Sequence, residues 1–155
     1  MRIRSLLALG VAAAVAALSA APASAAPATT FTQTVKGVTE SFPEVNECSG
    51  ATGTVTITYN GVFHVTELAS GGLHVTGTQT GTFTFVPDDP SEPTYTGRFT
   101  TWFGENVNAR NATGTFTFRV RGVGSDGSVL RFHQVAHFSV SATGVTVEFD
   151  RTRCF

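Results

Sequence analysis

The chain has 155 residues, of which 41% are hydrophobic and 14% are charged, and its formal net charge is −1 at pH 7. A length of this order suits one domain with a core of its own, so we expect a single domain. The lack of a basic excess argues against a general nucleic-acid binder.

The first predicted element is a secretory signal peptide at residues 1–25. Arg2 and Arg4 precede an apolar run, and small residues follow it up to a cleavage site after Ala25. The run is shorter than the roughly 20 residues that a membrane-spanning helix needs, so we expect removal and not anchoring. Removal takes two of the ten basic residues and none of the eleven acidic ones, which leaves a formal charge of −3. We therefore predict a secreted, extracellular protein with a single domain at 26–155 and no membrane span.

The rest of the chain predicts antiparallel strands, because it is rich in Thr, Val and Phe, alternates apolar with polar residues and is punctuated by glycine-containing turns. Consecutive strands joined by short turns predict an all-β, eight-stranded, up-and-down antiparallel β-barrel. A β-sandwich is the alternative fold. The expected strands are 31–41, 53–59, 62–68, 73–85, 95–103, 113–123, 128–141 and 145–152.

Two turns determine the expected strand register. Asn60-Gly61 is typical of a two-residue type I′ hairpin, which places Tyr59 opposite Val62. At 125–127, a three-residue loop with a left-handed Gly127 brings the apolar rows of both flanking strands together. This register pairs Phe116 with Ala136, Phe118 with Gln134 and Val120 with Phe132. The other residues expected on the same inner face are Val55, Ile57, Tyr59, Val62, His64, Thr66, Leu68, Leu73, Val75, Gln79, Phe83, Phe85, Tyr95, Phe99, Thr101, Phe103, Leu130, Phe138, Val145, Val147 and Phe149.

The two cysteines, Cys48 and Cys154, are expected to form a disulfide, since an exported protein reaches a compartment where disulfides persist. The bond would close a loop of about 106 residues, for which chain entropy predicts a stabilisation of about 4–5 kcal/mol. A closed eight-strand meander places the two cysteines at opposite ends. That separation conflicts with a disulfide, so we expect residues 42–52 to run back along the barrel. In a β-sandwich the conflict would not arise.

Three constellations that suggest catalysis or metal binding are not supported by their spacing. His133 and His137 would lie about 13 Å apart on a strand, too far to share a metal ion. Glu148 and Asp150 are expected on the solvated outer face, where a glycosidase-type carboxylate pair is not favoured. The serines near the 125–127 turn lack the Gly-x-Ser-x-Gly pattern. We expect no catalytic residue, metal or cofactor.

The predicted inner face contains neutral polar groups in an apolar lining, as small-molecule pockets do. The first functional hypothesis is therefore non-enzymatic binding of a small neutral or apolar ligand inside the barrel. A filled core, in which these groups satisfy one another or hold water, is the alternative. A cyclase or isomerase that uses His64 as acid or base is a further hypothesis. The candidate ligand-binding residues are Tyr59, His64, Gln79, Tyr95 and Gln134.

The predicted outer face gathers arginines on neighbouring strands, with Arg121 directly opposite Arg131. Like charges that face each other are unfavourable unless an anion or an acidic neighbour offsets them. One interpretation of this pattern is an interaction with a carbohydrate or anionic polymer of the cell envelope, although surface charges more often have no specific partner. The alternative is an exposed face balanced by Glu148 and Asp150. The candidate surface residues are Arg98, Trp102, Arg119, Arg121, Arg131 and His133.

Four segments carry a resemblance to known sequences: Phe-Pro-Glu-Val-Asn at 42–46, Tyr-Asn-Gly-Val-Phe-His-Val-Thr at 59–66, Tyr-Thr-Gly-Arg-Phe at 95–99 and Phe-Arg-Val-Arg-Gly at 118–122. On these segments the chain resembles small secreted bacterial proteins that have no known activity. The resemblance implies no functional residue. The expected barrel is also similar to the calycin (lipocalin-like) and allene oxide cyclase architectures, but a fold does not transfer a function.

Overall fold

A computed structural model describes residues 27–141 and 144–155. The expected signal peptide and its cleavage site after Ala25 lie outside the described residues. Seven antiparallel strands form one sheet in sequence order, so the predicted all-β antiparallel fold is confirmed with seven strands instead of eight. None of the described segments is a helix long and apolar enough to cross a membrane. The strands are β1 (Thr29–Val45), β2 (Thr52–Glu67), β3 (Leu73–Pro87), β4 (Tyr95–Val107), β5 (Asn111–Gly124), β6 (Val129–Ser141) and β7 (Gly144–Cys154).

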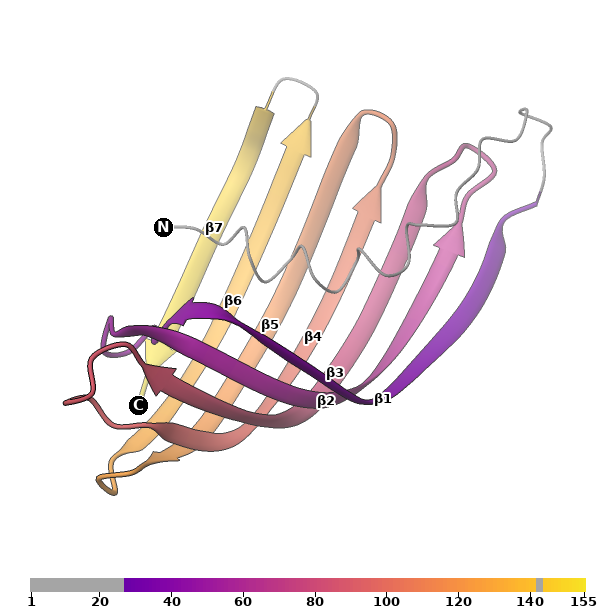
Figure 1. Cartoon of the computed structure of the whole chain (residues 1–155). Helices are drawn as coiled ribbons and strands as arrows, with labels where there is room; N and C mark the ends of the chain where they lie inside the picture. The colour runs from indigo at the N-terminus through magenta and orange to yellow at the C-terminus, as the bar shows by residue number, and fades with distance from the viewer. Residues whose placement is uncertain (1–26, 142–143) are drawn as a thin grey trace.

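The sheet curls over one of its own faces, which we call the inner face (Figure 1). β1 and β2 bend near their middles, so that the turn between them lies beside the end of β7. β1 and β7 do not pair along the described residues, and each forms an edge of the sheet. The core lies inside the curl because the aromatic residues of alternate positions meet there. Its buried members are Tyr59, Phe83, Phe85, Phe99, Val120, Leu130 and Phe132.

The outer face is mostly threonine over β1–β3. Cross-strand hydroxyl pairs form there, as between Thr39 and Thr58 at 2.9 Å and between Ser41 and Thr56 at 2.8 Å. Such pairs satisfy the side chains without a hydrophobic partner, so this face needs no covering layer.

The β5–β6 hairpin confirms the prediction made from the 125–127 turn. Gly127 has a φ of 85°, and the Gly124 amide donates to the Ser128 carbonyl at 2.8 Å. Phe116 then pairs with Ala136, Phe118 with Gln134 and Val120 with Phe132. A three-residue loop with a left-handed glycine fixes the register because the side-chain period of a strand is two.

The predicted hairpin at Asn60-Gly61 is wrong, because β2 runs through both residues without a turn. Neither residue has the positive φ that a type I′ turn requires. Instead, the Asn60 side chain accepts a hydrogen bond from the amide of Gly37 at 2.9 Å. Gly37 has a φ of 62° and lies in the β1 bulge between Val35 and Val38. The Asn-Gly pair thus supports the bend of two long strands.

The continuous strand reverses the predicted orientation of the residues after Gly61. Odd-numbered residues of β2 face inward, so Val65 is buried whereas His64 and Val62 lie on the outer face and are exposed. Thr66 also lies on the outer face, where its hydroxyl meets that of Thr30 at 3.0 Å. A two-residue turn at Asn60-Gly61 would have placed the even-numbered residues after it on the inner face. Because β2 is continuous, the odd-numbered residues stay on the inner face along its whole length.

Merging two predicted strands into β2 also removes the conflict over the disulfide. With seven strands, the turn after β1 and the end of β7 lie at the same end of the sheet, and Cys48 and Cys154 are bonded as predicted. The expected return segment at 42–52 is wrong: β1 continues to Val45, and residues 46–51 form a tight turn. Pro43 is tolerated in β1 because an edge strand does not need every amide for pairing.

The register of β7 shows that the predicted inward and outward sides of this strand were wrong. Cys154 pairs with Phe132 and faces inward toward Cys48, so the period of two carries Asp150 and Glu148 inward as well. Phe149, predicted inside, is 43% exposed on the outer face. The apolar residues of β7 had suggested the opposite register. The disulfide and the pairing with β6 decide the orientation instead.

Candidate functional site

Five arginines and one histidine lie in two rows on the outer face of β4–β7, and we call this set the arginine surface. In the first row, Arg98 pairs with Arg121, which pairs with Arg131. The second row crosses the sheet from β5 to β7. In it, Arg119 pairs with His133, which pairs with Arg153. Side chains at these positions share one face because they are direct cross-strand neighbours.

Among the described residues, none of these cations forms an ion pair with a carboxylate. The two acids expected to offset the arginines, Glu148 and Asp150, face the opposite side of the sheet. Neighbouring strands lie about 4.8 Å apart, so the three arginines of the first row crowd like charges within about 10 Å. Like charges directly opposite each other destabilise a sheet, so stability does not explain this row.

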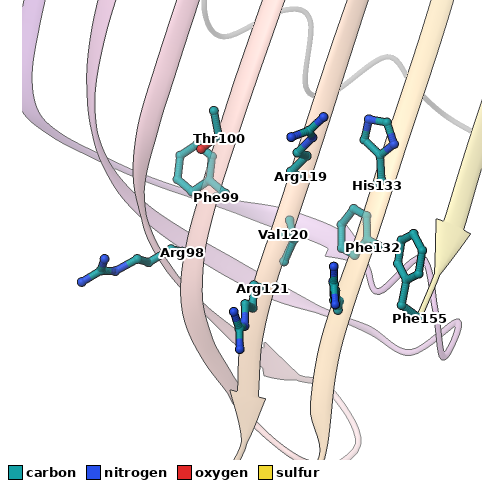
Figure 2. A pocket seen from close by; sticks show the side chains of 10 residues that line it. Arg98, Phe99, Thr100, Arg119, Val120, Arg121, Phe132, His133 and Phe155 are labelled. Atoms are coloured by element: carbon teal, nitrogen blue, oxygen red, sulfur yellow. The ribbon is translucent and has the colours of Figure 1, made fainter.

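A hollow of about 440 Å³ lies on the arginine surface (Figure 2). Side chains of β4, β5 and β6 border it, and Phe155 closes one end beside the last strand. The guanidinium carbons of Arg131 and Arg153 both lie 5.1 Å from the centre of the Phe155 ring. Cation–π contacts of this kind hold the two charged groups in place without neutralising them.

His133 lies in the second row, between Arg119 and Arg153. Its Nε2 atom is buried and has no hydrogen-bond partner among the described residues. A buried polar atom without a partner costs free energy.

Trp102 lies next to the arginine surface, in the row that pairs with Thr78 and Thr117, and is 48% exposed. An indole ring offers a flat apolar face and one N–H donor. The six surface residues named from the sequence therefore do lie together. Arg153 and Phe155 were missed, although the alternation of Arg151 and Arg153 at the C-terminus marks one strand face.

Four of the five candidate ligand-binding residues lie on the inner face. Tyr59, Gln79, Tyr95 and Gln134 all lie there. His64 lies on the outer face, where its Nδ1 is 2.9 Å from the Thr32 hydroxyl. A cyclase with His64 as acid or base inside the curl is therefore not compatible with the structure.

Three of the four inner polar residues already have partners. The Tyr59 hydroxyl donates to Glu40 at 3.1 Å, and Tyr95 accepts from Ser128 at 3.0 Å. The Gln134 amide donates to both oxygens of Asp150 at 3.0 and 2.9 Å. These groups stabilise the curl, as buried polar groups with partners do.

Acidic side chains gather where the β1–β2 turn meets β7. Burial raises the pKa of Glu47, and the nearby charges of Asp150 and Glu44 raise it further. Two carboxylates in proximity repel, so the inner face at this end is a region of negative potential. The described residues contain no group of three or more His, Cys, Asp or Glu side chains arranged to hold a metal ion.

Comparison with protein-family models, with curated proteins and with solved structures found no match. Function must therefore be inferred from the geometry and charge of the two faces.

Proposed function

We propose that this protein binds an anionic polysaccharide through the arginine surface. The row of Arg98, Arg121 and Arg131, without a carboxylate partner in the described part of the chain, is the observation that carries this proposal. Guanidinium groups bind carboxylate, sulfate and phosphate groups in a bidentate manner. A bound polyanion would turn an unfavourable row of like charges into a favourable one.

A polymer fits the arginine surface better than a small anion. The rows reach from β4 to β7, a distance of about 14 Å at the strand spacing. One small anion would neutralise some of the arginines in these rows and leave the others without a counter-charge. Trp102, exposed beside the rows, gives a sugar ring an apolar face to stack on. The net negative charge of the chain opposes nonspecific binding of any polyanion, so the proposal rests on the local charge of the arginine surface.

The proposal includes an extracellular location. A disulfide between Cys48 and Cys154 is of the kind that persists outside the cytoplasm, and the N-terminal sequence is typical of a signal peptide. In fold terms we regard the curled sheet as an incomplete up-and-down barrel whose outer face, and not its lumen, carries the main site.

The test is a binding titration with dextran sulfate, alginate and duplex DNA as probes over a series of salt concentrations. We expect Arg121→Gln/Arg131→Gln to weaken binding to dextran sulfate by about tenfold or more at low salt and to flatten its salt dependence. The matched control is Lys36→Gln/Arg110→Gln, which removes two positive charges away from the arginine surface and should leave affinity within about twofold.

Equal affinity of the two double variants would overturn the proposal. Tighter binding to DNA than to both polysaccharides would instead assign the arginine surface to nucleic acid.

A further inference from the structure

A second hollow, separate from the arginine surface, lies on the inner face within the curl. Its volume is about 110 Å³. Side chains from β1 to β6 line it, and most of them are aromatic or aliphatic, among them Phe42, Ile57, Phe83, Phe118 and Leu130. The bent halves of β1 and β2 form its roof, and the Cys48–Cys154 bond fixes the turn that ends them.

The volume of the cavity limits its occupant. An apolar cavity of about 150 Å³ in another protein stays dry and binds benzene or xenon. A cavity of about 110 Å³ with a mostly apolar lining therefore has room for one small ring. Water gains little from such a lining because it would find few polar partners there.

Two polar side chains border the cavity without partners of their own. Gln79 on β3 pairs directly with Thr101 on β4, and both line the cavity. Neither side chain forms a hydrogen bond within the described part of the chain. Gln134 lies in the same row on β6, two strands beyond Thr101, and differs because its amide donates to Asp150. An apolar lining with a few free polar groups is what orients a ligand in a small-molecule pocket.

The charge around the cavity selects against anions. Glu44 lines it, and the acidic side chains of Glu47 and Asp150 interact with one another near the same turn. A carboxylate ligand would enter a region that already carries negative charge. An uncharged ligand would not be repelled.

We propose that this cavity binds a small, uncharged, single-ring compound with one hydroxyl or carbonyl group, which the Gln79 amide and the Thr101 hydroxyl orient. The binding is independent of the arginine surface.

The experiment uses phenol, benzene and benzoate as probes and follows the amide and side-chain signals of the disulfide-bonded protein by NMR. We expect saturable shifts with phenol, weaker binding of benzene and none of benzoate. Gln79→Leu should reduce the affinity for phenol to that for benzene and leave benzene binding unchanged. Gln33→Leu, the same substitution on the inner face outside the cavity lining, should change neither.

A second variant tests the location. Val55→Phe fills the cavity and should abolish binding of phenol and benzene; Ile57→Phe replaces it if Val55→Phe does not fold. The absence of saturable shifts for both phenol and benzene in the wild type would overturn the proposal. So would unchanged phenol binding in the folded cavity-filling variant. Binding of dextran sulfate should be the same in all of these variants, which separates this proposal from that for the arginine surface.

Discussion

At the scale of single residues, partners decide which polar groups stabilise the fold and which remain available. Tyr59 and Gln134 lie on the inner face as neutral groups in an apolar setting, yet each is engaged by a carboxylate. Gln79 is placed by the same alternation and has no partner among the described residues. Alternation therefore identifies which residues point inward. The neighbouring strand decides which of them can still bind something else.

The hydroxyl of Tyr59 gives a prediction on pH dependence. Burial, together with the charge of Glu40 and the hydrogen bond to it, raises the pKa of Tyr59 to about 12. Because the folded-state pKa lies above the ordinary value of 10.0, this group stabilises the fold below pH 10 and loses that contribution as the pH rises toward 12. We expect a phenolate absorbance change near pH 12 that is missing in Tyr59→Phe. An unchanged titration curve in Tyr59→Phe would contradict the assignment.

At the scale of elements, glycines allow long strands to bend and pack closely. A Cβ added at Gly97 on the inner face of β4 would overlap the backbone of Arg121 and Gly122 on β5. Backbone atoms cannot rotate away, so the strands would have to separate. At Gly104, on the outer face of the same strand, the nearest atoms lie at 3.7 and 3.8 Å.

This difference predicts opposite results for one substitution at two positions of β4. Gly97→Ala should lower the free energy of unfolding by about 1–3 kcal/mol, as overpacking does. Gly104→Ala should leave it unchanged or raise it slightly, because alanine restricts the unfolded chain. Chemical denaturation of both variants provides the measurement. Equal stabilities would show that β4 and β5 are free to adjust at Gly97.

At the scale of the whole molecule, the disulfide joins two regions that belong to opposite edges of the sheet. Cys48 lies in the turn after edge strand β1, and Cys154 ends edge strand β7. The bond thus holds the curl where strand pairing does not close it. The core and the inner cavity lie between the segments that it connects.

Removing the disulfide should therefore affect the inner face more than the outer one. We expect Cys48→Ser/Cys154→Ser to lose up to about 4–5 kcal/mol of stability, as the chain-entropy model predicts for a loop of this length. Binding of phenol should weaken, because the roof of the cavity is no longer held. Thermal unfolding and the NMR titration measure the two effects. Wild-type phenol affinity in this variant would show that packing alone keeps the cavity in place.

Local patterns in the sequence determined the strands, the direction of most side chains and the β5–β6 hairpin. The rules behind them act over a few residues: alternation has a period of two, and Gly127 supplies the left-handed conformation that its turn needs. The pairing of Arg121 with Arg131 and of Arg119 with His133 followed from that hairpin. The disulfide followed from the presence of two cysteines in a chain expected to be exported.

Only the tertiary structure decided the path of β2 and which side chains of β7 point to the inner face. Asn60-Gly61 favours a turn locally, but here it supports a bulge in β1 that lies far away in the sequence. The inward position of Asp150 follows from a disulfide that spans 106 residues and from its contact with Gln134. Several contacts between distant segments together contribute more free energy than one local conformational preference, so they decide the structure at these positions.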